Sequence, residues 1–197
     1  RALPEDLRSL SLDAITFSRM SDANTRFKNL EFLCVRYLEV DARLLLSMPR
    51  LRYLVLQSCE ITNANVLGEL RDLRKCDFSR STGLESIDFV TRLPRLHSLD
   101  LTDTDVRAVP DIAGNSALRA LSFEGTRILE FPSASQVRLL DVSRTPLAAN
   151  PKAAMAVLDG NPTCMIRGSH IDMLRRALAG VDRLEVFPRS YSDKPVE

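Results

Sequence analysis

The sequence repeats one short pattern of apolar residues about every 22 residues. Each copy has apolar residues at its first, fourth and sixth positions. The copies start at Leu7, Leu30, Leu51, Leu73, Leu96, Leu118 and Val137, and in six of these seven copies a further apolar residue follows ten residues after the start. A short strand with two inward residues, followed by a turn, explains this spacing better than a helix or a plain alternating strand. One such unit cannot bury its own apolar face, so the chain must stack its copies side by side.

The copy that starts at Leu73 departs from the pattern. Gly83 occupies the place of the later apolar residue, and Leu84 follows one residue late. We therefore expect a local one-residue bulge at this point of the chain.

The spacing and the period of this pattern resemble those of leucine-rich-repeat proteins. The regular copies cover residues 7–147, and irregular copies continue through residues 148–187. The resemblance implies an α/β fold, a curved leucine-rich-repeat solenoid with a parallel β-sheet on its concave face and short helices or 3₁₀ turns on its convex face. We expect a single domain over residues 1–187, followed by a polar tail at 188–197.

The ninth position of each copy, where this family has an asparagine, holds other residues here. They are Ile15, Leu38, Cys59, Ser81, Thr104, Thr126 and Thr145. Cys, Ser and Thr side chains can bond neighbouring backbone groups in a turn, whereas Ile15 and Leu38 cannot. The Thr-containing copies are similar to the intracellular repeats of immune receptors, bacterial effectors and protists.

The segments between the strands predict the convex side. Helical spacing behind Asp or Thr caps predicts short helices at 41–48 and 62–70, with another at 87–93. The Pro-rich segments 110–115 and 132–136 favour 3₁₀ or extended structure. After the regular copies we expect a helix at 150–158, a strand at 163–166, a helix from 169 or 170 to 178, and a last copy at 181–186.

Composition limits the cellular setting. The net charge of +1 and the absence of a long apolar run argue against nucleic-acid binding and membrane insertion. The four cysteines, Cys34, Cys59, Cys76 and Cys164, have neither the terminal clustering of extracellular repeats nor metal-site spacing. We therefore expect a reducing, cytoplasmic location. Because the chain starts almost inside its first repeat, we also expect it to be a fragment of a longer protein.

No pattern of residues predicts catalysis. His97 and His170 are the only histidines and lie far apart in the array, and there is no phosphate loop, nucleophile elbow or dinucleotide fingerprint. A thiol nucleophile at Cys34, which we expect to point outward, has no histidine near it in the pattern. We expect no catalytic residues, no metal, no cofactor and no small-molecule ligand.

The third, fifth and seventh positions of the copies should face outward from the concave sheet. In the second and third copies these positions predict an apolar, aromatic surface with basic residues at its margin. The predicted partner-binding residues there are Phe32, Cys34, Arg36, Tyr37, Arg52, Tyr53 and Val55. Exposed aromatic and Arg side chains concentrate binding energy, although a preceding segment or irregular packing of the first copies could cover these residues instead.

The later copies predict an acidic strip, which we also assign to partner binding. Its residues are Asp77, Asp100, Asp103, Glu124 and Asp141. Neighbouring aspartates are also common on solvated sheets, and Arg74, Lys75 and Arg80 would partly neutralise them. A calcium site would need a clustered acidic loop, of which Asp100 and Asp103 are only a weak trace.

These patterns together favour a non-enzymatic module that binds a protein partner through its concave face, as a scaffold, adaptor or sensor. The alternative is the substrate-recognition domain of a larger enzyme, such as a ubiquitin ligase or a bacterial-type effector, whose catalytic part lies outside this chain.

Overall fold

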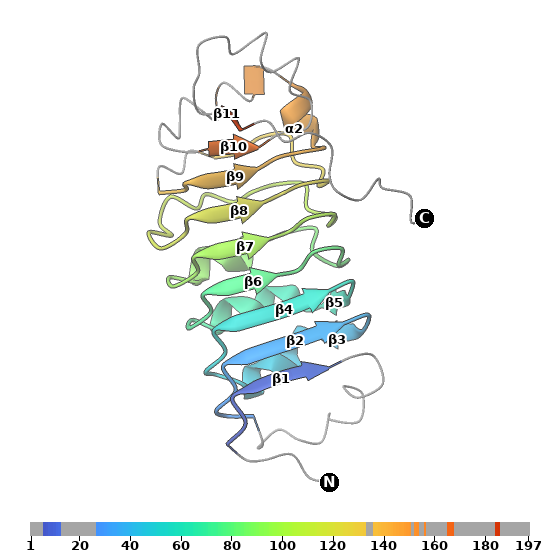
Figure 1. Cartoon of the computed structure of the whole chain (residues 1–197), viewed down its shortest axis with the longest axis vertical. Coiled ribbons are helices and arrows are strands. Elements are labelled where there is room, and N and C mark those ends of the chain that lie inside the picture. Colours follow the sequence, from blue (N-terminus) through green and yellow to red (C-terminus); the bar gives the residue numbers. More distant parts are fainter. Residues whose placement is uncertain are drawn as a thin grey trace, which may run out of the picture.

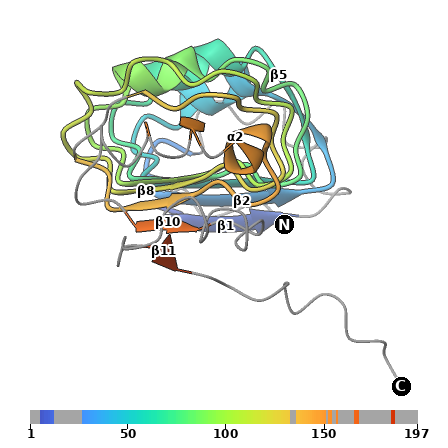
Figure 2. The same ribbon diagram turned by 90° about the horizontal axis from the view of Figure 1, so that it is seen from above.

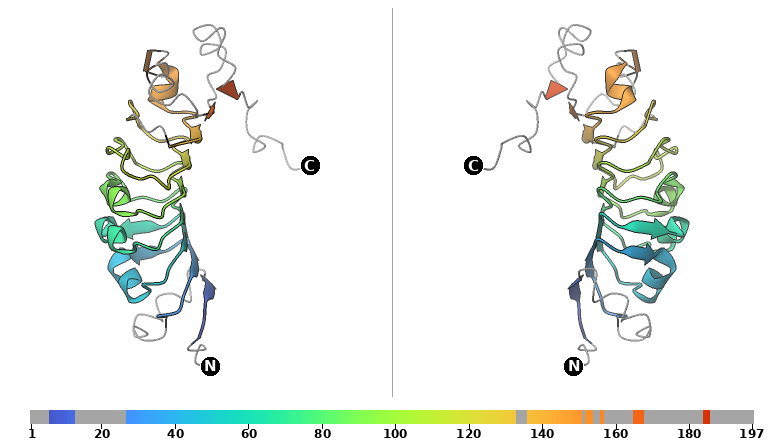
Figure 3. Two further views of the ribbon diagram at one scale, coloured as in Figure 1. Left: turned by 90° about the vertical axis from the view of Figure 1, so that its left-hand side faces the viewer. Right: turned by 90° about the vertical axis from the view of Figure 1, so that its right-hand side faces the viewer.

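The computed structural model describes residues 6–12, 27–132, 136–150, 152, 153 and 156, and the backbone of 165–167 and 184–185. Within these residues the chain winds into a stack of similar coils, and each coil contributes one strand (Figure 1). Seen from above, the strands form one side of the coil and the 3₁₀ helices the opposite side (Figure 2). The stack is curved with the sheet on its inner side, so the predicted solenoid is confirmed (Figure 3).

The described strands form one nine-stranded sheet in which every neighbouring pair is parallel. Its order is β1 (Ser9–Leu12), β2 (Phe32–Arg36), β4 (Tyr53–Gln57), β6 (Lys75–Asp77), β7 (Ser98–Asp100), β8 (Ala120–Ser122), β9 (Leu139–Asp141), β10 (Met165–Arg167) and β11 (Leu184–Glu185). Equivalent repeat positions pair with one another along the sheet. The repeat register deduced from the apolar spacing is therefore correct.

Behind the sheet lies a second layer of short elements. Two short strands, β3 (Glu39–Asp41) and β5 (Glu60–Thr62), pair in parallel, and three 3₁₀ helices follow: η2 (Ala42–Ser47), η3 (Ala64–Glu69) and η4 (Asp88–Arg92). The three 3₁₀ helices occupy the three segments for which helices are predicted. Asp41 caps η2 by accepting the backbone N–H of Arg43. The cap predicted at Thr62 is wrong, because the residue before η3 is Asn63, which is left-handed and makes no side-chain cap bond.

The core runs as one continuous column through the stack. The first, fourth and sixth positions of the regular copies from Leu30 onward are buried, together with the later apolar residue of each copy. In the copy that starts at Leu73, Leu84 is fully buried, and Gly83 before it has a φ of +83°. A Cβ at Gly83 would overlap the carbonyl oxygen of Ile61, so only glycine fits the extra residue predicted there.

The ninth-position residues use their side chains as expected. Thr104, Thr126 and Thr145 are buried, and each hydroxyl donates to the carbonyl three residues earlier at 2.6–2.7 Å. The Ser81 hydroxyl instead reaches the preceding copy. In the second copy Leu38 is half-buried and supplies no such bond, whereas Ile15 lies outside the described residues.

The end of the array is described only in part. Thr145 caps the short helix α2 (Pro146–Ala149), which the sequence reading missed. β10 overlaps the strand predicted at 163–166, and β11 falls within the last predicted copy. The helices predicted at 150–158 and 169–178 lie largely or wholly outside the described residues, so the domain boundaries at 1–187 and 188–197 stay predictions. No helix in the described part is long and apolar enough to span a membrane.

Candidate functional site

The outward rows of the concave sheet are the candidate site. Strand pairing places the third positions of successive copies side by side, in the order Phe32, Tyr53, Lys75, Ser98, Ala120 and Leu139. The fifth positions form the adjacent row, in the order Cys34, Val55, Asp77, Asp100, Ser122 and Asp141. The first row is thus aromatic at one end, and three of the six residues of the second row are aspartates.

The predicted apolar surface forms around β2 and β4. Phe32 is half-buried, Tyr53 beside it is 37% exposed, and Val55 is half-buried. The two ring–ring contacts among the described residues lie elsewhere, so Phe32 and Tyr53 are neighbours through strand pairing and not a stacked pair. We call Phe32, Tyr53 and Val55 the aromatic patch.

Cys34 does not belong to this exposed surface. The repeat position of Cys34 predicts an outward, accessible thiol, but Cys34 is only 5% exposed. Its short side chain lies in an outward row between Phe32 and Arg36 along β2 and beside Val55 of β4. A small side chain among larger neighbours is shielded by them, which removes Cys34 as a binding residue and as an accessible nucleophile.

The residues predicted at the margin of the patch lie at opposite ends of the strands. Arg36 ends β2, where its Nε donates to Oε1 of Gln57 at 2.9 Å. Tyr37 follows and is 70% exposed. Arg52 precedes β4, and its Nη1 lies 3.0 Å from Oε2 of Glu31. Arg36 and Tyr37 therefore border the patch at its carboxyl end, and Arg52 borders it at its amino end.

Three of the acidic residues stabilise the turn that follows their own strand. Asp77, Asp100 and Asp141 each end a strand, and each carboxylate accepts the backbone N–H two residues later at 2.9–3.0 Å. Gln57 also donates to Asp77 at 2.7 Å. These bonds hold the turn after each strand and use part of the acceptor capacity of each carboxylate.

The other two acidic residues meet one arginine. Arg144 Nη2 lies 2.7 Å from Oδ1 of Asp103, and its Nε lies 3.1 Å from Oε1 of Glu124. The neutralising cations expected from the sequence were Arg74, Lys75 and Arg80, but the bonds that the structure shows to these two carboxylates come from Arg144. In the described part of the chain no group of three His, Cys, Asp or Glu side chains could hold a metal ion.

A feature that the sequence reading missed is a column of left-handed residues at the eighth position. Its members are Tyr37, Ser58, Arg80, Asp103, Gly125 and Arg144, with φ between 52° and 70°. From Tyr37 to Gly125 each backbone N–H in this column donates to a carbonyl of the next copy at 2.7–3.1 Å. Gly125 is the clearest signal of this conformation in the sequence and Asp103 a weaker one, since Tyr, Ser and Arg rarely adopt it. The absence of a side chain at Gly125 also leaves room for Arg144 to reach Asp103. A Cβ at Gly125 would overlap the carboxylate of Asp103.

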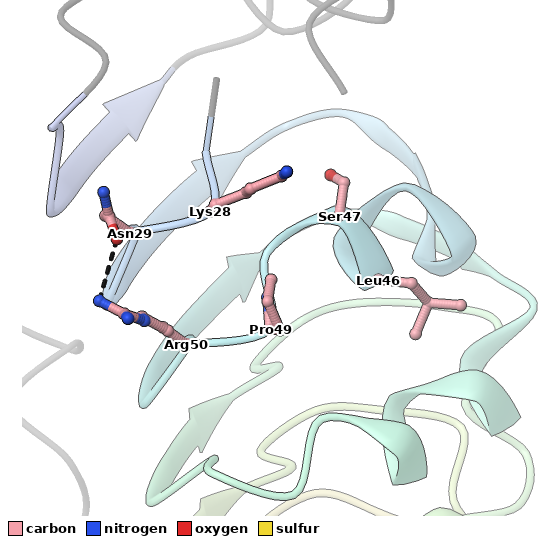
Figure 4. A pocket seen from close by; sticks show the side chains of 6 residues that line it. All are labelled: Lys28, Asn29, Leu46, Ser47, Pro49 and Arg50. Carbon is pink, nitrogen blue, oxygen red and sulfur yellow. Dashed lines mark hydrogen bonds between the residues drawn. The ribbon is translucent and has the colours of Figure 1, made fainter. Parts of the chain in front are cut away.

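Two shallow hollows lie away from the concave rows. One of about 550 Å³ is lined by Lys28, Asn29, Leu46, Ser47, Pro49 and Arg50, and Arg50 donates to Asn29 across its edge (Figure 4). The other, of about 370 Å³, is lined by Arg107, Ala108, Val109, Leu129, Glu130, Phe131 and Pro132. Neither contains a histidine or a cysteine.

No family model and no curated protein matches the sequence, whereas solved structures match the fold. A leucine-rich-repeat protein of Leptospira interrogans superposes with a TM-score of 0.64 at 17% identity, over 82% of this chain and 49% of that one. Internalin C2 of Listeria monocytogenes gives 0.61 at 19% identity, over 83% of each chain. The chain has the leucine-rich-repeat fold. In the mouse RP105/MD-1 complex a matching chain gives 0.66 at 16% identity, over 93% of this chain and 35% of that one.

This chain therefore spans about half of the Leptospira protein and about a third of the matched chain in the mouse complex. A solenoid of this kind presents its curved sheet as a long, regular concave surface (Figure 3). On this leucine-rich-repeat scaffold His97 is exposed, with Nδ1 2.6 Å from the carbonyl oxygen of Arg95. His170 lies outside the described residues.

Proposed function

We propose that this chain is a non-enzymatic interaction module that binds a protein partner at the aromatic patch. The observation that carries the proposal is the pairing of β2 with β4, which sets Phe32 beside Tyr53 on the outward, concave side of the sheet. Neither ring belongs to the buried core, so neither is needed to fill it. Aromatic side chains held on a rigid sheet, with few rotors to freeze, are suited to anchor a partner.

The surroundings of the patch support this assignment. Tyr37 adds a 70% exposed ring at the carboxyl end of β2, next to Arg36. Tyr and Arg are the residue types in which interface energy concentrates, and here they flank the two rings. A partner that covered the patch would also exclude water from Arg36 and strengthen its polar contacts.

The acidic residues have a different proposed role. Asp77, Asp100 and Asp141 already accept backbone N–H groups, and Asp103 and Glu124 are paired with Arg144. We therefore assign them to steering the partner, with reversal of their charge changing association rate and salt dependence more than the strength of the final complex.

The same proposal covers the cellular setting. Cys34, Cys59 and Cys76 are free and buried, which supports a reducing, cytoplasmic compartment. Within it the module would act as a scaffold, adaptor or sensor, without nucleic-acid binding, membrane insertion or a small-molecule ligand. The second candidate, substrate recognition for a ubiquitin ligase or bacterial-type effector, would use the same patch and differs only in what the full-length protein carries beyond this chain.

Site-directed crosslinking tests the location of the partner. A photoreactive phenylalanine analogue replaces Tyr53 in one variant and Leu46, which is 42% exposed on the opposite layer, in another. The proposal predicts a protein adduct from position 53 that is absent from position 46 and is competed by unlabelled chain. Adducts that form only from position 46 would place the partner on the convex side and refute the proposal.

A further inference from the structure

The amino ends of the strands carry a row of four arginines and one histidine. It consists of the second-position residues Arg52, Arg74, His97, Arg119 and Arg138. In this row each backbone N–H donates to the carbonyl of the second-position residue in the preceding copy, at 2.8–2.9 Å. The five residues therefore stand on successive rungs of the stack. With about 4.8 Å between parallel strands, the row is ~19 Å long.

The turns that lead into the strands add charge of the same sign. The two positions before the start of each copy contribute Lys28, Arg50, Arg71 and Arg95. We call these residues and the row together the basic edge. In the six copies from Leu30 to Val137, the second position and the two positions before the start contain eight Lys or Arg side chains and two carboxylates, Glu31 and Asp72. The whole chain has a net charge of only +1. The rest of the chain is therefore net negative, and positive charge is concentrated on this edge of the solenoid.

Part of this charge is not compensated by the described chain. Arg52 pairs with Glu31, and Arg95 pairs with Asp72. Arg119 donates to the backbone carbonyls of Ser116 and Leu118 and so retains its full charge. Arg71 and Arg74 are exposed, and within the described residues neither side chain makes an ion pair or hydrogen bond. The edge therefore offers cations to a group from outside.

We infer that the basic edge binds an acidic polypeptide segment, at a site that adjoins the aromatic patch at Arg52. Arginine dominates the edge, and its guanidinium fork binds carboxylates in a bidentate manner. An extended segment of about six residues is ~20 Å long, which matches the row. The hollow lined by Lys28 and Arg50 opens at the N-terminal end of this edge, where Pro49 offers an apolar wall to the same segment (Figure 4).

The neighbouring acidic row selects against nucleic acid. Asp77, Asp100 and Asp141 stand three residues farther along their strands than the basic row, which is ~10 Å away. A narrow peptide can follow the edge without covering them. A double helix, with one negative charge per ~1.7 Å of its axis, would extend across those carboxylates and be repelled.

Fluorescence anisotropy with defined probes tests this inference. The probe is a labelled peptide of about six consecutive glutamates, which matches the length of the row. The test variant combines Arg71→Glu and Arg74→Glu, and the matched control combines Arg107→Glu and Arg127→Glu. The control residues are also exposed and lie beyond the carboxyl ends of the strands, so the change in net charge is identical. Circular dichroism on both variants verifies that they are folded.

The expected result is that the test variant binds the peptide at least about tenfold more weakly than the parent, whereas the control stays within about twofold. An equal loss in both variants would reduce the effect to net charge and overturn the inference. Tighter binding of an oligonucleotide of equal charge would also overturn it, in favour of a nucleic-acid surface. Because the aromatic patch is unchanged in all these proteins, neither result bears on the proposed function.

Discussion

The buried Ser81 hydroxyl connects two neighbouring copies, and its removal tests the internal bonding of the stack. Ser81 Oγ donates to the carbonyl oxygen of Leu56 at 2.7 Å and accepts the backbone N–H of Cys59 at 2.9 Å. Both groups belong to the preceding copy. Ser81 itself is fully buried, so water cannot replace the hydroxyl without a local rearrangement. Ser81→Ala removes one oxygen atom and leaves the apolar packing nearly unchanged.

The cost follows from the two backbone groups that lose their partner. A buried donor or acceptor left without a hydrogen bond costs about 1–3 kcal/mol, so the loss of both bonds in Ser81→Ala should lower the free energy of unfolding by about 2–6 kcal/mol. Ser79→Ala is the matched control in the same turn. Its hydroxyl donates to Oδ1 of Asp77 at 2.7 Å but is only half-buried, so the expected cost is below about 1 kcal/mol.

Urea denaturation of the full chain, followed by circular dichroism, measures both values. We expect a clearly lower urea midpoint for Ser81→Ala at an unchanged slope, and little change in the midpoint for Ser79→Ala. Equal costs for the two serines would show that the ninth position does not bridge the copies, and would refute the reasoning about it.

Three further changes probe the core, the left-handed column and the thiols. Leu99 lies in the middle of the sheet and is 1% exposed, so Leu99→Ala should lower the free energy of unfolding in urea by about 2–5 kcal/mol. A loss near zero would contradict the register. Gly125→Ala should displace Asp103 from Arg144 and destabilise the chain, and adding Asp103→Ala should recover part of that loss, since the overlap is removed; no recovery would assign the cost to the backbone alone. Burial raises the pKa of Cys76, so its thiol should resist alkylation until the chain unfolds, and a thiol titration without reductant that finds a disulfide would contradict the free cysteines of the structure.

The sequence determined the architecture because the apolar period is set by burial. Residues such as Leu54, Leu99 and Leu140 recur at the spacing that one inward face requires, and strand pairing then aligns all equivalent positions. The Thr and Ser residues at the ninth position were predictable for the same reason, since a buried turn needs a side chain that can bond backbone.

Other features depend on neighbours that the pattern does not contain. The burial of Cys34 is set by the larger side chains around it and not by its own position in an outward row. Tyr37 and Arg80 adopt left-handed backbone where their N–H groups bond carbonyls of the next copy, although their residue types give no sign of it. The basic edge could not be predicted from the sequence pattern, because its members are some 20 residues apart. They come together only when strands such as β4 and β6 pair.

The most direct test of the central claim is calorimetry with the partner that crosslinks at position 53. The variant Phe32→Ala with Tyr53→Ala removes both rings of the aromatic patch, and the control Leu46→Ala with Leu129→Ala removes two exposed apolar side chains elsewhere. We expect a loss of at least about 2 kcal/mol in binding free energy for the first variant, roughly thirtyfold in Kd, and no comparable loss for the control. Unchanged affinity in a folded variant without the two rings would contradict it.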